Sequence, residues 1–426
     1  KAGRGLREGR GTALDPRLEP LRWLAVGVQE PKAELAKLMT AEMGKAIKES
    51  DAEIDKCVAS VRALIEHFPH WRAEIEHKTG NGYEVTREPL GVIVGIMPWN
   101  FPLWQVVRFA APTLLCGNAI LLKHSTNTWG SAEFIDRIFN ETLPAGAFRH
   151  LRVDHDVIGD LIADQRVRGV SLTGSRRAGV SVGERAGKHL KKCVLELGGS
   201  DAYVVLDDAD VAQAATVSAR SRVINAGQSC VSAKRFIVTR KNHSQFLEAF
   251  VAEMKKFKLG DPADPATDMG PLARRDLRDE LDRQVQASVK AGAKVALSGG
   301  PQDGPGNFYA ASVLGDVRPG QKAFDEELFG PAAAVIEAKD ETDAFRLANL
   351  SRYGLGGAVF SKDVERAHSL ARLEFDTGMI AINDFVRSDV LAPFGGVRDS
   401  GLGRELGRDG CFEFTNIKSI FTPKSR

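Results

Sequence analysis

The sequence lacks the features that define several common protein classes. It has few cysteines and no C-x-x-C pair; the five are Cys57, Cys116, Cys193, Cys230 and Cys411. An odd number without paired spacing argues against a disulfide framework or a zinc knuckle, and indicates a reducing, cytoplasmic compartment. The longest apolar stretch, residues 106–122, is interrupted by Arg108, Pro112 and Asn118, so we expect no membrane span.

An excess of charge of one sign is also missing. With 58 Lys and Arg against 56 Asp and Glu, the formal net charge is +2. No global field therefore draws the protein to nucleic acid or to an anionic membrane. The nine histidines show no ligand spacing, and we predict no metal site. The first residue is Lys1 instead of Met, so we expect the natural N-terminus to lie upstream.

The apolar residues follow two kinds of pattern in turn. Residues 14–78 carry apolar side chains at helical spacing and predict amphipathic helices. Asn81-Gly82 then predicts a turn before a strand that ends near residue 90. Over residues 91–197, short apolar runs alternate with helical stretches, which is typical of a parallel sheet covered on both faces.

A second helix–strand alternation runs over residues 202–390. The sequence therefore predicts an α/β protein with two such units. Parallel sheets bind ligands at the carboxyl ends of their strands, and we expect the important motifs at those ends. The segment GLGREL, residues 401–406, follows no clear strand and is interpreted as a surface turn.

Cys230 is the candidate nucleophile. It ends the segment NAGQSC, whose small polar residues suit an accessible thiol with room for a substrate. The alternative is a buried small hydrophobe, which Cys57 and Cys193 fit because they lie in apolar periodic stretches.

Glu196 is the candidate base. It lies between Leu195 and Leu197 at the end of a predicted strand, just before two glycines. Burial would raise its pKa and make it a usable base near neutral pH. An exposed carboxylate at a strand end is the alternative.

Asn100 lies in MPWNFP, between a predicted strand and a predicted helix, with prolines on both sides. Its pinned amide could donate to a developing oxyanion or could simply cap the helix. Trp104 and Arg108 follow at intervals of four residues and are expected on the same stripe. Arg108 would face the substrate there, or would instead pair with a carboxylate of the protein.

The signals for phosphate binding are partial. Gly174 and Ser175 end a predicted strand and open a helix, which is an anion site in principle. No G-x-G-x-x-G followed by an acidic residue occurs there, so the ordinary dinucleotide-binding fingerprint is absent.

These motifs, in this order, resemble the aldehyde dehydrogenase superfamily. The resemblance rests on PWNFP (98–102), LLKHS (121–125), LTGS (172–175), LELGGSDAYVVLDDAD (195–210), GQSC (227–230), EELFGP (326–331) and PFGG (393–396). It covers nearly the whole chain. Within the superfamily the sequence is most similar to bacterial NAD(P)-dependent succinate-semialdehyde dehydrogenases.

The resemblance implies a covalent oxidation mechanism. Cys230 would attack an aldehyde as thiolate. Asn100 and the backbone N–H of Cys230 would hold the oxyanion, and Glu196 would activate water to hydrolyse the thioester. A Cys hydrolase or acyltransferase that needs no nicotinamide is the alternative from another class, and it would require a His partner for Cys230.

The resemblance also assigns the substrate side. Arg108 matches a carboxylate-binding arginine, Trp104 would lie beside it, Ser388 would assist, and Phe394 would line the tunnel. Succinate semialdehyde is the expected substrate. Glutarate semialdehyde and neutral aliphatic aldehydes are the alternatives.

A nicotinamide cofactor is implied as well. The positions that match the family's cofactor motifs are Lys123 at the adenosine ribose, Gly174, Ser175 and Trp99 near the pyrophosphate, and Glu327 with Phe329 at the nicotinamide ribose. NAD-preferring members often carry Glu where this chain has Thr126. A neutral residue does not repel a 2′-phosphate, so we expect NADP, with NAD possible. Selectivity set elsewhere in the adenosine pocket is the alternative.

Three further positions depart from the family pattern. His124 replaces a proline, and Ser232 replaces a second cysteine, so no redox switch between paired cysteines is expected. Ile224 stands where some semialdehyde members have a second substrate arginine.

Family architecture implies three parts. A Rossmann-type cofactor domain would span 1–70 and 90–198, and an α/β catalytic domain would span 199–410. The segments 71–89 and 411–426 would form a small β oligomerisation arm, because an exposed strand pairs with a neighbour's sheet. A homodimer or homotetramer is expected.

Overall fold

Three helices open the described part of the chain, residues 15–423 of this computed structural model. They are α2 (Asp15–Gln29), α3 (Lys32–Met43) and α4 (Ile47–Ile75). The helices predicted over 14–78 are confirmed as far as Ile75, whereas His77 and Lys78 form a strand; residue 14 lies outside the described residues. Their apolar stripes, including Leu35, Met39 and Val58, are buried in one core with the first sheet.

A six-stranded sheet forms the first unit, in the order β17-β7-β6-β3-β4-β5. The strands are β3 (Val92–Met97), β4 (Ala119–His124), β5 (Phe148–His150), β6 (Val167–Thr173), β7 (Lys192–Glu196) and β17 (Gly401–Leu402). The connecting helices are α5 (Trp104–Leu115), η1 (Thr126–Thr128), α6 (Trp129–Thr142), α7 (His155–Ala163) and α8 (Arg176–Lys188). Strands β3 to β7 run parallel. Strand order reverses between β3 and β6, so their carboxyl ends frame a topological switch point, where such sheets bind ligands.

The second unit is a seven-stranded sheet in the order β10-β13-β14-β9-β8-β15-β16. Its strands are β8 (Ala202–Val205), β9 (Arg235–Thr239), β10 (Lys294–Leu297), β13 (Ser312–Gly315), β14 (Ala332–Ala338), β15 (Gly356–Phe360) and β16 (Met379–Ile382). Its helices are α9 (Val211–Val223), η2 (Ile224–Gly227), α10 (Arg240–Met254), α11 (Arg275–Lys290), α12 (Lys322–Asp325), α13 (Glu341–Asn349) and α14 (Val364–Glu374). A two-stranded pair, β11 (Gly300–Pro301) and β12 (Tyr309–Ala310), lies beside it. The predicted α/β class is confirmed.

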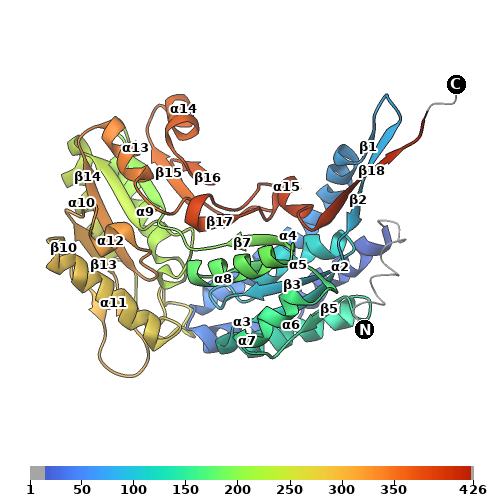
Figure 1. Cartoon of the computed structure of the whole chain (residues 1–426). Helices are drawn as coiled ribbons and strands as arrows, with labels where there is room; N and C mark the ends of the chain where they lie inside the picture. The colour runs from blue at the N-terminus through green and yellow to red at the C-terminus, as the bar shows by residue number, and fades with distance from the viewer. Residues whose placement is uncertain (1–14, 424–426) are drawn as a thin grey trace.

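A three-stranded antiparallel arm projects from the body (Figure 1). It consists of β1 (His77–Lys78), β2 (Tyr83–Pro89) and β18 (Thr415–Phe421). Gly82 has φ 93°, which confirms the predicted turn at Asn81-Gly82. The C-terminal strand β18 pairs antiparallel with β2 and forms one edge of the arm. Its side chains Ile417 and Phe421 are exposed. Residues 424–426 of the expected arm lie outside the described residues.

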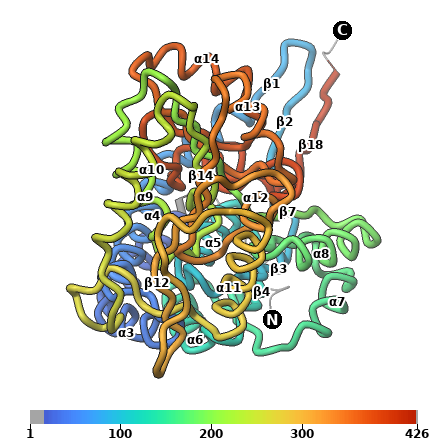
Figure 2. The backbone as a smooth tube through the Cα atoms, turned by 90° about the vertical axis from the view of Figure 1, so that its left-hand side faces the viewer, coloured from blue at the N-terminus to red at the C-terminus, as the bar shows by residue number. Residues whose placement is uncertain are grey.

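Within residues 15–423, no helix is both long and apolar enough to cross a membrane. The longest apolar stretch of the sequence, residues 106–122, instead forms most of α5 and the first part of β4. All 12 residues of α5 are buried. In the view of Figure 2, α5 lies deep in the interior of the molecule.

The prediction of a surface turn over residues 401–406 is wrong. Gly401 and Leu402 form β17, which pairs with the end of β7, and Glu405 and Leu406 are buried. Gly401 has φ 141°, and a Cβ there would lie 1.9 Å from the Leu195 carbonyl oxygen. These glycines therefore serve close backbone approach, which the local pattern does not distinguish from a turn.

The chain around β17 returns to the first unit. It contains η3 (Arg398–Ser400) and α15 (Gly407–Cys411). Val390, Phe394, Leu406, Cys411 and Phe414 are buried in the same core as α4 and α5. This segment therefore packs on the six-stranded sheet, although most of it falls within the 199–410 range that we assigned to the catalytic domain.

Replacement of Gly401 by alanine tests this close contact. Gly401→Ala is expected to lower the free energy of unfolding by about 2 kcal/mol or more, because the new Cβ must displace backbone. Thermal unfolding measures the effect. Gly187→Ala is the control, since no atom lies within 4 Å of an added Cβ in that part of α8 and alanine favours a helix. Equal melting temperatures for both variants would contradict the assignment.

Candidate active site

Cys230 lies on the loop that joins η2 to β9, and it packs against the core of the first unit. It therefore precedes a strand, and the expectation that every motif lies at a strand's carboxyl end is wrong for this residue. Asn225, Ala226 and Gly227 all have left-handed backbone, with φ of 54°, 51° and 77°. A Cβ on Gly227 would lie 2.3 Å from the carbonyl carbon of Gly330. Such strain persists only where the surroundings fix the turn, and it is concentrated at functional sites.

Hydrogen bonds from both units hold this loop. The Asn225 amide donates to the Asn100 carbonyl oxygen at 2.7 Å, and the Asn100 amide donates to the Gln228 carbonyl oxygen at 3.1 Å. On the other side, Lys234 Nζ donates to the carbonyl oxygens of Ser229 and Cys230, at 2.9 and 2.6 Å. The backbone around the thiol is thus fixed from two directions.

Asn100 does not cap α5. Glu53 Oε1 performs that task by accepting from the backbone N–H groups of Leu103 and Trp104, at 2.9 and 2.8 Å. Asn100 is buried in the turn before the helix. An amide has two N–H donors, and the bond to Gln228 uses one. The helix-cap alternative is wrong, and a second donor is available for an oxyanion.

Glu196 is buried at the end of β7. Among the described residues, neither of its carboxylate oxygens has a hydrogen-bond partner. Burial raises the pKa of this carboxyl well above its usual range, and the nearby Glu405 carboxylate adds to the effect. A Cβ on Gly395 would lie 2.5 Å from Glu196 Oε1, so glycine there makes room for the carboxylate. The exposed-carboxylate alternative is wrong, and the group is suited to a base near neutral pH.

The thiol of Cys230 is half-buried and protonated at neutral pH. Burial raises its pKa to about 12, although the cations of Lys234 and Arg108 act in the opposite direction. Attack by a thiolate therefore requires that this proton leave first, either to water or to a nearby base. The charged groups that act most on the thiol include no histidine.

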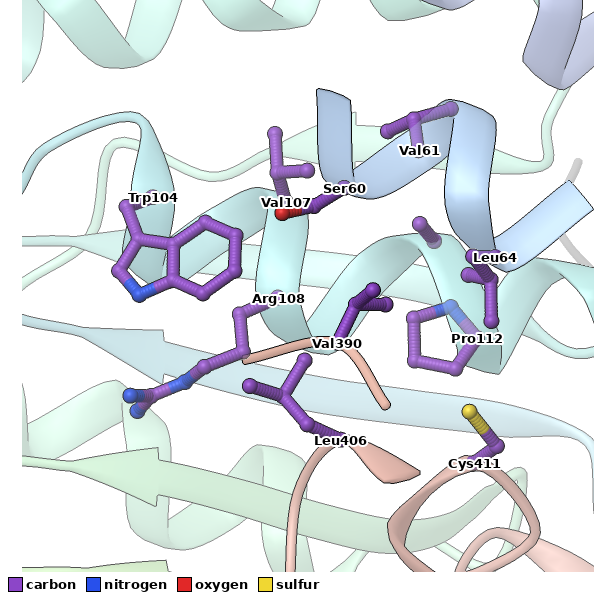
Figure 3. Close-up of a pocket in the computed structure, with 11 residues that line it drawn as sticks. Ser60, Val61, Leu64, Trp104, Val107, Arg108, Pro112, Val390, Leu406 and Cys411 are labelled. Carbon is purple, nitrogen blue, oxygen red and sulfur yellow. The ribbon is translucent and has the colours of Figure 1, made fainter. Parts of the chain in front are cut away.

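Arg108 is buried and forms an ion pair with the Glu405 carboxylate. It also donates to Thr173 Oγ1 at 3.2 Å, and its guanidinium lies 4.4 Å from the centre of the Phe394 ring. The sequence left open that Arg108 pairs with a carboxylate of the protein, and Glu405 is such a carboxylate. Trp104 and Arg108 lie side by side on α5 at a small pocket, with Leu406 beneath them (Figure 3).

The remaining substrate-side prediction, Ser388, is joined to Trp104 through Lys56. The ammonium of Lys56 lies 4.3 Å from the centre of the Trp104 ring and donates to Ser388 Oγ at 2.5 Å. The structure thus gathers Trp104, Arg108, Ser388 and Phe394 around one region.

The residues assigned to the cofactor lie along the carboxyl edge of the first sheet. Lys123 is buried at the end of β4, and Thr126 is exposed on η1 just beyond it. Ser175 caps α8 by accepting from the Ala178 N–H, and the Gly174 N–H donates to the Glu196 carbonyl oxygen at 2.9 Å. These positions lie on both sides of the switch point.

The remaining residues assigned to the cofactor, Trp99, Glu327 and Phe329, lie toward the loop that carries Cys230. Trp99 and Phe329 pack edge to face with ring centres 5.8 Å apart. Glu327 accepts from the Gly199 N–H at 3.0 Å and lies 3.4 Å from Lys234 Nζ. A carboxylate expected at the nicotinamide ribose is therefore linked, through Lys234, to the carbonyl of Cys230.

His124, the residue that replaces proline, is fully buried and neutral. Burial lowers its pKa to about 4. Its Nε2 lies 3.0 Å from the Pro102 carbonyl oxygen and its Nδ1 lies 2.9 Å from Thr128 Oγ1. Through the contact with Pro102, His124 connects the end of β4 to the turn that contains Asn100.

Five residues of this site were not predicted from the sequence. They are Lys56, Asn225, Gln228, Lys234 and Glu405. Asn225 and Gln228 lie within the quoted segment NAGQSC, and Glu405 lies within GLGREL. Lys234 lies just before β9, where a lysine beside an apolar run was the available signal. Lys56 gave no signal, because it lies on the polar face of a predicted amphipathic helix. Within the part of the chain that the structure describes, no cluster of His, Cys, Asp or Glu could hold a metal ion.

Comparison with known proteins now identifies the class. The chain matches the model of the aldehyde dehydrogenase family over residues 1–420, and it belongs to this family.

Two relatives and one solved structure are particularly similar. The chain is 43% identical to the succinate semialdehyde dehydrogenase (NAD(P)+) Sad of Escherichia coli strain K12, over 99% of this chain and 91% of the relative. It is 44% identical to the succinate-semialdehyde dehydrogenase (NADP(+)) of Deinococcus radiodurans, over 99% and 88%. The crystal structure of succinic semialdehyde dehydrogenase from Streptococcus pyogenes in complex with NADP+ superposes with a TM-score of 0.96 at 35% identity, covering 99% of this chain and 93% of that one.

Glu405→Gln tests the electrostatics of the base. The substitution removes the like charge beside Glu196 and releases Arg108, and both changes favour the ionised carboxylate. The pKa of Glu196 should fall, so the rise of kcat for aldehyde oxidation with pH should move to lower pH by about one unit or more. The control is Glu337→Gln. It removes an exposed carboxylate on β14 that pairs with Arg240 of α10. A rising limb that stays at the wild-type pH would refute this coupling.

Proposed function

We propose that this aldehyde dehydrogenase oxidises succinate semialdehyde to succinate, with NADP+ as the preferred acceptor. The observation that carries the reaction type is the buried, unpartnered Glu196 carboxylate in the same site as the clamped Cys230. The names of the most similar relatives support the substrate and the cofactor. Two cations, Arg108 and Lys56, beside the thiol-bearing region support an anionic aldehyde.

The reaction begins with transfer of the Cys230 thiol proton to solvent water. The thiolate adds to the aldehyde carbon, and the oxygen that becomes negative accepts from the second N–H of Asn100 and from the Cys230 backbone N–H. A bound nicotinamide would supply the hydride acceptor, and loss of the hydride from the substrate carbon leaves an acyl group on the Cys230 sulfur. Glu196 then takes a proton from water, the hydroxide adds to the thioester carbon, and the C–S bond breaks to release the acid and the thiolate.

The residues at the sheet edge fit a nicotinamide dinucleotide phosphate. Ser175 opens α8, whose N-terminal N–H groups favour an anion. A Cβ on Gly179 would lie 2.5 Å from a Leu197 side-chain carbon, so glycine lets this helix approach the sheet closely. Lys123 forms no ion pair among the described residues, and Thr126 brings no negative charge. We assign Lys123 and Thr126 to the adenosine ribose, Gly174, Ser175 and Trp99 to the pyrophosphate, and Glu327 with Phe329 to the nicotinamide ribose.

For the substrate we assign the tunnel wall to Trp104 and Phe394, with Arg108 and Ser388 toward the far carboxylate. We also propose that the arm of β1, β2 and β18 joins subunits in a homodimer or homotetramer. Its support is the exposure of Ile417 and Phe421, at 60% and 54%, on a strand that projects from the body.

Single-turnover kinetics with succinate semialdehyde tests the catalytic roles. Cys230→Ser should abolish oxidation and keep NADP+ binding, because only the nucleophile is lost. Glu196→Gln should still give a burst of reduced cofactor and then stall as a thioester. Loss of the burst itself would assign Glu196 to thiol activation, and measurable steady turnover by Cys230→Ser would refute the covalent mechanism.

Thr126→Glu tests the cofactor assignment. The new carboxylate should repel the 2′-phosphate and accept from a ribose 2′-OH, so kcat/KM should fall about tenfold or more for NADP+ and rise for NAD+. Thr126→Gln is the matched control without charge. A wild-type enzyme that strongly prefers NAD+ would contradict the assignment.

A further inference from the structure

Lys56 is a cation without an anionic partner in the substrate region. Its side chain leaves α4 and covers the face of Trp104, with Ser388 Oγ as its hydrogen-bond acceptor. Among residues 15–423, no carboxylate lies within 4 Å of its ammonium. A half-buried ammonium in such a place lacks the opposite charge that usually accompanies it.

The position of Lys56 is fixed by its own helix. Glu53, three residues earlier on α4, accepts from the backbone N–H groups of Leu103 and Trp104 at the start of α5 and pairs with Lys45. This contact sets the register of α4 against α5, so the next turn of α4 must lie beside Trp104. Lys56 is therefore held at the wall of the site by structure that does not depend on a ligand.

The carboxylates near Lys56 are already committed or exposed. Glu53 is engaged by Lys45 and by α5. Asp389 acts on Lys56 only at longer range, and its side chain faces solvent. Burial and the Arg108 cation lower the pKa of Lys56 to about 8, so it still carries its proton at neutral pH.

Arg108 alone is a poor reader of a second carboxylate. Its guanidinium is already paired with Glu405 and bonded to Thr173, so a substrate carboxylate would have to share it. The uncommitted positive charge in this region belongs to Lys56.

We propose that Lys56 is the specificity-determining cation that binds the far carboxylate of the substrate, with Ser388 beside it. This inference rests on the proposed function, since it assumes an ω-carboxy aldehyde. The Ser388 hydroxyl, which now accepts from Lys56, would turn to donate to the same carboxylate. Trp104 separates this polar end from the apolar path to Cys230, with which it shares a core.

The test uses the full-length enzyme and three aldehydes of similar length. They are succinate semialdehyde, its neutral methyl ester methyl 4-oxobutanoate, and butanal. Lys56→Met removes the charge and keeps the length of the side chain. We expect KM for succinate semialdehyde to rise at least about tenfold with kcat little changed, because a charge-assisted bond is lost. The two neutral aldehydes should change less than about twofold.

Two further variants control for charge and for folding. Lys56→Arg restores the charge and should recover most of the affinity for succinate semialdehyde. Lys32→Met removes another cation from the same helical layer, one that pairs with Asp55, and should leave all three aldehydes unchanged. If Lys56→Met does not fold, Lys56→Gln is measured in the same way.

The outcomes separate this inference from the proposed function. Equal changes in KM for charged and neutral aldehydes, or no change at all, would show that Lys56 does not read the carboxylate. A wild-type enzyme that handles butanal as efficiently as succinate semialdehyde would instead refute the proposed substrate. A wild-type preference that survives in Lys56→Met would refute only the assignment of Lys56.

Discussion

The site depends on one exchange of hydrogen bonds between two loops. Asn225 donates to the carbonyl of Asn100, and Asn100 donates to the carbonyl of Gln228. One loop belongs to the six-stranded sheet and the other leads into the seven-stranded sheet, so these bonds join the two units beside the thiol. Three successive left-handed residues are tolerated before Cys230 because this contact holds them. The nucleophile is consequently placed by the meeting of two units, and neither unit contains the site alone.

Much of the architecture could be predicted from the sequence. The alternation of short apolar runs with helical stretches predicted the parallel sheet of β3 to β7, because fully buried parallel strands admit few polar residues. Cys230, Glu196 and Asn100 could be singled out because each is a chemically capable residue in an unusual local setting. The residue types and their neighbours were sufficient for those three.

What failed depends on contacts between distant segments. GLGREL looked like a turn because its glycines permit one, yet Gly401 is required by the carbonyl of Leu195, over 200 residues earlier. The cap of α5 is Glu53 instead of the adjacent Asn100, and Arg108 meets Glu405 from the returning chain. Lys56 reaches Ser388 across the same fold. No local pattern encodes such pairs, because the register between elements is decided only when they pack.

Some charged side chains in the described part of this fold form ion pairs, and others form none. Lys45 pairs with Glu53, Arg108 pairs with Glu405, and Lys234 lies against Glu327. Such pairs offset the large cost of removing ions from water. Lys123, Glu196 and Lys56 form no ion pair among the described residues. They lie at the proposed cofactor end, at the proposed base and at the proposed carboxylate end of the substrate. Other buried cations without an ion pair within residues 15–423, Arg222 and Arg235, instead donate to several backbone carbonyl oxygens. A missing ion pair therefore points to a ligand only where the chain supplies no such carbonyl acceptors, and we propose that the reactants bind along the three positions where it does not.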